Sequence, residues 1–179
     1  MIRDSRQLKA KVKQLTKGDS HKSQVYIRLF FMERFLERIS QSPYSDQFIL
    51  KGGLLIASLV GLDLRSTMDI DSTVKGLPLN LEEAELIVQE IIKTPVGEAV
   101  NFVITKATQI MGEHDYPGKR FALQGSFDGI RQAIRIDLST GDAITPQAVS
   151  YDYQLMFEER SIRLMTYNLE TLLAENWKQ

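Results

Sequence analysis

In the segment from residue 68 to residue 74, Asp69, Asp71 and Thr73 alternate with Met68, Ile70 and Ser72. A period of two is that of a β-strand, in which residues two apart share one face. Asp69, Asp71 and Thr73 are therefore expected on one face of this strand. Two carboxylates that close repel each other, and a divalent cation would relieve the repulsion. Surface strands also carry such pairs without any function, so the pattern alone leaves both interpretations open.

A third carboxylate lies on a second alternating segment, residues 132–139, where isoleucine and leucine alternate with Arg135, Asp137 and Ser139. Three carboxylates on two neighbouring strands can hold two metal ions, and Mg²⁺ prefers such hard oxygen ligands. Asp137 could instead be a solvated strand residue near a turn. Arg135 could contact a phosphate or pair with a carboxylate.

Two adjacent glycines, Gly52 and Gly53, separate a short apolar strand at 48–50 from an apolar helix at 54–60. Glycines at a helix N-terminus let backbone amides approach a phosphate, although a tight turn needs the same residues. Arg65, Ser66 and Thr67 come just before the two aspartates, where they could bind triphosphate oxygens or simply end a loop.

The remaining periodicities predict further helices and strands around this centre. Helices are expected within residues 1–20 and over 21–42, 80–93 and 169–177, with Asn80 and Glu83 forming a capping box. Strands are expected over 101–111, 120–127 and 132–139, followed by a hairpin that pairs 153–158 with 161–166. This order of elements indicates an α+β fold with a mixed sheet and packed helices.

Composition excludes several classes of protein. The 179 residues include no cysteine, which excludes disulfide scaffolds, thiolate metal sites and cysteine nucleophiles. The formal net charge of −1 does not by itself indicate a nucleic-acid binder. No apolar run approaches the roughly 20 residues that a membrane span needs, so we expect a cytoplasmic protein without a membrane partner.

The segments "KGG", "LRSTMDID" and "RIDLSTGD" resemble the nucleotidyltransferases of the AbiEii/AbiGii toxin group, within the polymerase-β-like superfamily. The resemblance runs from about His21 to the end of the sequence. It implies a nucleotidyltransferase core over 43–179, preceded by a helical segment over 1–42. It further implies a bacterial toxin of a toxin–antitoxin or abortive-infection system that transfers a nucleoside monophosphate to an acceptor hydroxyl, with RNA or tRNA as the acceptor and a separate antitoxin as partner.

The resemblance also assigns roles to particular residues. It implies that Asp69, Asp71 and Asp137 bind Mg²⁺, or Mn²⁺, and carry the catalysis. It implies that Gly52 and Gly53 hold the nucleoside triphosphate, and Arg65, Ser66 and Thr67 match the polar run that precedes the paired aspartates in the family.

The sequence departs from the family near its end. Family members continue after "LETLLAE" with a lysine and a long helical C-terminal half, whereas this sequence has Asn176 at that point and ends at Gln179. We therefore expect a truncated C-terminal helical region. A chain shortened in this way could be an inactive binding module, and a phosphate-handling hydrolase using the same carboxylates is a third, weaker alternative.

Overall fold

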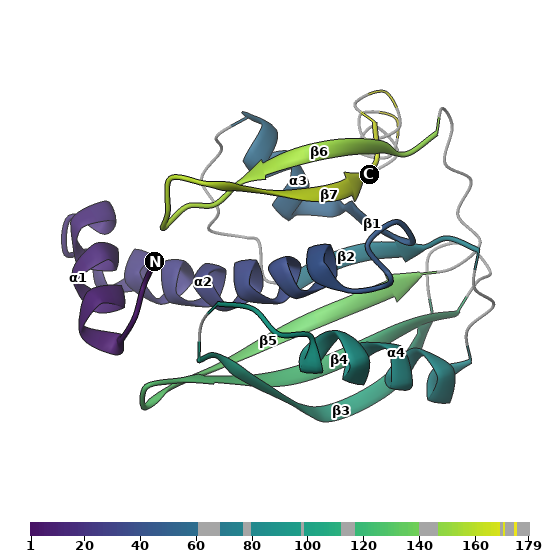
Figure 1. The fold of residues 1–179 in the computed structure, drawn as a ribbon, viewed down its shortest axis with the longest axis horizontal. Coiled ribbons are helices and arrows are strands. Elements are labelled where there is room, and N and C mark those ends of the chain that lie inside the picture. The colour runs from purple at the N-terminus through teal and green to yellow at the C-terminus, as the bar shows by residue number, and fades with distance from the viewer. Residues whose placement is uncertain are drawn as a thin grey trace.

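The computed structural model describes residues 1–60, 69–76, 80–97, 99–111, 117–139, 147–168, 170 and 174, and Figure 1 shows their arrangement. The helices are α1 (Ser5–Thr16), α2 (Ser20–Gln41), α3 (Gly52–Val60) and α4 (Leu81–Lys93). The strands are β1 (Phe48–Lys51), β2 (Asp69–Val74), β3 (Asn101–Met111), β4 (Pro117–Phe127), β5 (Ile130–Ser139), β6 (Val149–Gln154) and β7 (Ser161–Thr166). None of the described helices is both long and apolar enough to cross a membrane.

The seven strands form one mixed sheet in the order β3-β4-β5-β2-β1-β7-β6. The β2–β5 and β1–β7 pairs are parallel, and the other four pairs are antiparallel. The two parallel pairs join segments that are distant in sequence, which places β2 and β5 side by side at the centre of the sheet. The predicted α+β fold with a mixed sheet is confirmed.

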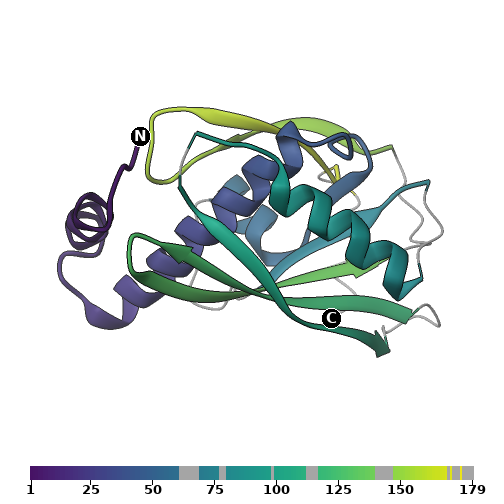
Figure 2. The ribbon, with the colours of Figure 1, turned by 60° about the horizontal axis from the view of Figure 1, so that its bottom comes forward.

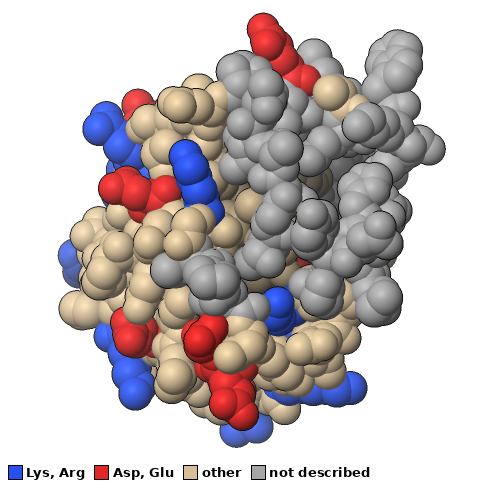
Figure 3. Space-filling model, turned by 90° about the vertical axis from the view of Figure 1, so that its right-hand side faces the viewer, with Lys and Arg blue, Asp and Glu red and all other residues tan. Residues whose placement is uncertain are grey.

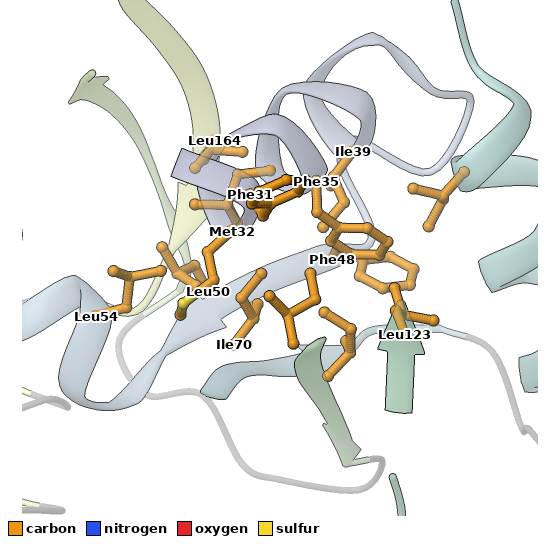
Figure 4. Packing of buried hydrophobic residues seen from close by; sticks show 14 of the residues in the cluster. Phe31, Met32, Phe35, Ile39, Phe48, Leu50, Leu54, Ile70, Leu123 and Leu164 are labelled. Atoms are coloured by element: carbon orange, nitrogen blue, oxygen red, sulfur yellow. The ribbon is translucent and has the colours of Figure 1, made fainter. Parts of the chain in front are cut away.

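Helices α2 and α4 lie together on one face of the sheet, as Figures 1 and 2 show. Phe30, Phe31 and Phe35 of α2 are fully buried there and meet other rings edge to face, which is the favoured geometry for aromatic pairs. Gly125 of β4 makes this close packing possible, because a Cβ atom at that position would lie 2.5 Å from the Phe31 ring. Figure 4 shows the resulting core between α2 and the sheet.

Local sequence signals account for the helix ends. The side chains of Asp4 and Asp19 accept hydrogen bonds from backbone N–H groups in the first turns of α1 and α2. Asn80 and Glu83 form the predicted capping box at the start of α4. These signals act within one turn of chain, and the helices they predict begin within a residue or two of the expected positions.

Two elements differ most from the prediction, and β4 begins at Pro117 instead of Arg120. Helix α3 begins at Gly52, so both glycines belong to the helix and not to a separate turn before it. The first strand of the final hairpin, β6, ends at Gln154, whereas the sequence predicted a strand over 153–158. Leu155 and Phe157 are buried in the connection between β6 and β7. Their alternation with polar residues has the period of a strand, which is why the sequence predicted one there. The helix predicted over 169–177 lies largely outside the described residues.

A cluster of charged side chains links the connection between β6 and β7 to α2 through ion pairs. We call Glu33, Arg34, Glu37, Glu158 and Arg160 the α2 charge cluster. The Arg34 guanidinium nitrogen Nη1 lies 3.4 Å from a Glu37 oxygen and 3.5 Å from a Glu158 oxygen, and Arg160 pairs with both glutamates. We did not predict this cluster from the sequence, although the repeated "ER" four residues apart inside a broad apolar stripe signals buried charge.

Glu33 is the most deeply buried acid of the cluster. Its side chain is fully shielded from solvent, and both carboxylate oxygens accept from the backbone N–H of Met156, at 2.7 and 3.1 Å. Burial raises the pKa of Glu33 to about 8, since it penalises the ionised form more than the Met156 N–H and Arg34 favour it. Glu33 therefore carries a proton in the native state at pH values where it is ionised in the unfolded chain.

This difference predicts a pH-dependent stability. Between the ordinary glutamate pKa and about 8, the native state binds one proton more than the unfolded state, so the free energy of unfolding falls as pH rises through this window. Glu33→Gln, which stays neutral, is expected to reduce this fall by up to a few kcal/mol. Urea denaturation at pH 5 and pH 8 measures it. The control Glu159→Gln, an exposed position of the same connection, should keep the wild-type pH dependence; an E33Q profile equal to wild type would contradict the prediction.

Candidate active site

The register of the central strands brings two of the predicted aspartates together. Asp71 of β2 stands directly opposite Asp137 of β5, and Lys51 of β1 stands opposite Asp71 on its other side. Arg120 of β4 stands opposite Asp137. Directly opposed side chains share one face of a sheet. Four strands thus contribute one charged row, Lys51–Asp71–Asp137–Arg120, on the face opposite the α2 core.

Arginine side chains hold two of the three predicted carboxylates. Arg120 donates to both oxygens of Asp137, with nitrogen–oxygen distances of 2.8 and 2.9 Å. Arg135 donates to both oxygens of Asp69 in the same way, at 2.7 and 3.0 Å. These are bidentate pairs, the geometry in which arginine binds a carboxylate most strongly. The hydrogen bonds to Asp137 raise the pKa of Arg120 further above its usual range.

Asp71 is in a different state from its two neighbours. Among the described residues, no hydrogen bond or ion pair reaches its carboxylate. Burial raises the pKa of Asp71, the negative charges of Asp137 and Asp69 add to this rise, and Lys51 and Arg120 oppose it, so that together they bring the pKa to about 6. Within the described part of the chain, Asp71 is thus a carboxylate without a hydrogen-bonded partner, and it lies beside two others.

The start of α3 closes the site around Asp71. Gly52 has a φ of +76°, a conformation that disfavours any residue with a Cβ atom. A Cβ at this position would lie 2.5 Å from Oδ2 of Asp71. Gly53 follows in the first turn and is exposed. The diglycine therefore lets a helix N-terminus approach the carboxylate closely, and this end of a helix also suits a phosphate.

Hydroxyl groups and a lysine continue the polar face beyond the aspartates. The Nζ of Lys51 donates to Oγ of Ser139 at 2.9 Å and lies 5.7 Å from the centre of the Tyr167 ring. The Thr73 hydroxyl is 3.2 Å from the Ser139 hydroxyl and 2.9 Å from the Tyr167 hydroxyl. This network fixes the ammonium group of Lys51 within the site, close enough to Asp71 to lower its pKa.

The structure thus gathers most of the residues expected from the sequence. Asp69, Asp71 and Asp137 share one sheet face, and Gly52 adjoins Asp71. Arg65, Ser66 and Thr67 lie outside the described residues. Of the two roles left open for Arg135, the structure shows the pairing with a carboxylate.

Two charged residues of the row were not predicted as site residues. Arg120 is the first residue of its predicted strand, with Ala122 and Gln124 on the same face, so its position on a polar face could have been read from the alternation. Lys51 directly precedes the diglycine. A charged residue between a buried strand and a helix could also have indicated a site residue.

The donor chemistry of this face fits a divalent cation in part. Carboxylate oxygens are the hard ligands that Mg²⁺ prefers, and Asp71 offers two of them without a resident partner in the described part of the chain. Within that part, however, no three acidic or histidine side chains are grouped closely enough to hold a metal ion. Asp69 and Asp137 are turned toward arginines, so a cation bound by all three aspartates requires both ion pairs to rearrange.

Figure 3 looks onto the side of the molecule at which β2 and β5 end. On the described part of this side, lysine and arginine alternate with aspartate and glutamate, and neither sign gathers into one large patch. Among the described residues of this side, a charged ligand therefore meets individual side chains of either sign and not one broad patch.

Comparison with known proteins identifies the family. Residues 34–177 match the family model described as the nucleotidyl transferase AbiEii toxin of type IV toxin–antitoxin systems. This segment contains the diglycine, all three aspartates and both arginines, and it covers most of the chain. The chain belongs to the AbiEii nucleotidyl transferase toxin family. No curated protein matches the sequence.

Two solved structures, both from Helicobacter pylori, resemble the fold. One is of a proposed nucleotidyltransferase, 14% identical in sequence, with a TM-score of 0.52 over 85% of this chain and 57% of that chain. The other, JHP933, is 17% identical with a TM-score of 0.49, over 85% of this chain and 55% of that chain. The chain thus spans little more than half the length of either protein. The first likeness shows that the fold is that of a nucleotidyltransferase structure.

The contact between Gly52 and Asp71 gives a test with a matched control. Gly52→Ala should lower the free energy of unfolding by about 2–4 kcal/mol, from backbone strain and the clash with Asp71. Gly18 has a similar φ of +82° with open space around it, so Gly18→Ala should show the strain alone, about 1 kcal/mol. Denaturant unfolding measures both. Combining Gly52→Ala with Asp71→Ala should recover part of the loss, and equal effects at both glycines would contradict the clash.

Proposed function

We propose that the chain transfers a nucleoside monophosphate from a nucleoside triphosphate to an acceptor hydroxyl, in a reaction that depends on Mg²⁺. The observation that carries this proposal is the pairing of Asp71 with Asp137 across β2 and β5, beside the N-terminus of α3. Membership of the AbiEii family supports the same class of reaction. Mn²⁺ has similar ligand preferences and is proposed as a substitute.

The bond changes of this transfer are those of a displacement at phosphorus. The acceptor oxygen bonds to the α-phosphorus, the bond from that phosphorus to the oxygen bridging the α- and β-phosphates breaks, and pyrophosphate leaves with the electron pair. Asp137 orients the acceptor hydroxyl and takes its proton. Backbone N–H groups at Gly52 and Gly53 bind phosphate oxygens, with Arg65, Ser66 and Thr67 as further proposed contacts.

Asp69, Asp71 and Asp137 would hold the cation in this proposal. A divalent cation, when bound, neutralises the triphosphate and the charge that develops on the leaving pyrophosphate. Asp71 suits this role because no described residue already pairs with its oxygens. Lys51, anchored through Ser139, places a fixed positive charge beside the same carboxylate and is suited to a phosphate oxygen.

The proposed acceptor is an RNA, in particular a tRNA, and the proposed partner is an antitoxin. The type IV toxin–antitoxin description of the family supports the antitoxin. Basic side chains extend from the site along the same face of the sheet, with Arg135 on β5 and Lys106 on β3, and phosphate groups of RNA favour such positions.

One observation favours a second function, that of a binding module without catalysis. The described residues contain no ready-made group of three metal ligands, and arginines already neutralise Asp69 and Asp137. Titration calorimetry with Mg²⁺ and each nucleoside triphosphate distinguishes the two functions, because the enzyme must bind both. A chain that binds antitoxin or RNA but neither ligand would be the binding module.

Substitution of the paired aspartates tests the enzymatic proposal. Asp71→Asn and Asp137→Asn are each expected to lower the transfer of labelled nucleoside monophosphate to tRNA by at least about 100-fold, because each removes a ligand or a proton acceptor. The assay resolves labelled RNA on a gel, with Mg²⁺ and each nucleoside triphosphate in turn.

The control is Asp152→Asn. Asp152 lies on β6 at the far side of the sheet, and its side chain is 68% exposed in a surface pair with Arg163. Transfer by this variant should equal that of the wild type. Transfer that survives in D71N and D137N would contradict the proposed function.

A further inference from the structure

We propose that Arg120 and Arg135 are exchangeable counter-ions: each guanidinium holds a site carboxylate in the absence of ligands, releases it to the divalent cation, and then binds phosphate oxygens of the nucleotide. This inference rests on the proposed function and deepens it, since it assigns nucleotide-binding roles to two side chains that are not metal ligands.

The two ion pairs are built alike, although they come from different strand pairs. Arg120 reaches Asp137 from β4 to β5, and Arg135 reaches Asp69 from β5 to β2. In each pair the guanidinium uses Nε and Nη2, and among the described residues Nη1 meets no acceptor. Each arginine therefore retains donors for a second anion while it holds its carboxylate.

Partial exposure makes both pairs exchangeable. The side chains of Arg120 and Arg135 are 36% and 45% exposed, whereas Asp137 and Asp69 are 16% and 20% exposed. An ion pair at this depth is only modestly stable, because water screens the guanidinium. Arg34 of the α2 charge cluster, at 1% exposure, shows the opposite case of a buried guanidinium that cannot leave without a large desolvation penalty.

The arginines and a divalent cation compete for the same carboxylate oxygens. A divalent cation that takes oxygens of Asp69 and Asp137 must displace two guanidiniums from the same oxygens, so the arginines weaken cation binding. A polyphosphate offers the displaced guanidiniums new acceptors of similar geometry. The nucleotide therefore favours the same rearrangement as the cation, and the two ligands bind with positive coupling through Arg120 and Arg135.

The test measures the two ligands separately. Calorimetry and the paramagnetic resonance of free Mn²⁺ give the affinity for Mn²⁺ alone, and calorimetry in the presence of a chelator gives the affinity for pyrophosphate alone. Arg120→Gln and Arg135→Gln should each raise Mn²⁺ affinity and lower pyrophosphate affinity, both by at least about fivefold. Loss of folded protein cannot raise an affinity, so shifts of opposite sign report the exchange itself.

Arg131→Gln is the matched control. Arg131 lies four residues before Arg135 on the same strand and the same face, is exposed, and pairs with no acid in the described part of the chain. It changes net charge by the same amount and should leave both affinities within about twofold of wild type. Asp71→Asn should weaken Mn²⁺ binding in every background.

The outcomes separate this inference from the proposed function. Mn²⁺ binding that Asp71→Asn weakens but neither arginine substitution strengthens would overturn the exchange and leave the proposed function standing. Unchanged pyrophosphate affinity in both arginine variants would likewise overturn it. Failure of the wild type and of both arginine variants to bind Mn²⁺ at millimolar concentration would overturn the exchange and the proposed metal-dependent transfer together.

Discussion

β2 and β5 pair in a register that sets Asp71 directly against Asp137, although like charges opposite each other destabilise a sheet. A shift of two residues would set Asp71 opposite Arg135, an attractive pair, and would keep Ile70 on the core face. The observed register must therefore be fixed elsewhere. On their outer sides both strands pair with antiparallel neighbours, β2 with β1 and β5 with β4, and Ile70 and Ile136 are buried in the shared core. Two further registers complete the charged row: β4 on β5 places Arg120 beside Asp137, and β1 on β2 places Lys51 beside Asp71.

The two charge groups of the molecule illustrate different uses of ionic side chains. In the α2 charge cluster, burial removes Arg34 and Glu33 from water, so their positions depend on the surrounding carboxylates and on the Met156 amide. On the opposite face, Arg120 and Arg135 remain partly hydrated, and their carboxylates can change partner at small cost. The first group fixes the hairpin to the core, whereas the second surrounds the carboxylates that we propose as ligand-binding residues.

Local patterns in the sequence predicted much of this molecule, and long-range pairing explains what they missed. The capping box of Asn80 acts within one turn, and the alternation around Asp71 and Asp137 depends only on the geometry of a single strand, so each was readable from the sequence. The partners of the carboxylates were not readable, because Arg120 meets Asp137 only through the register of β4 on β5. The extent of β6 was predicted wrongly because Leu155 and Phe157, which look like strand residues, are buried against other elements of the fold and not by strand pairing.

Strand β3 is an edge strand of the sheet. Its pairing with β4 contains a bulge, which affects whether a strand from another molecule could pair with it. The pairing of β3 with β4 shifts register between Ile104 and Lys106, so Thr105 bulges out of the ladder. A bulge followed by an exposed lysine interrupts the row of outward backbone N–H and C=O groups that a foreign strand would need. Such an interruption disfavours the pairing of a foreign strand along this eleven-residue border.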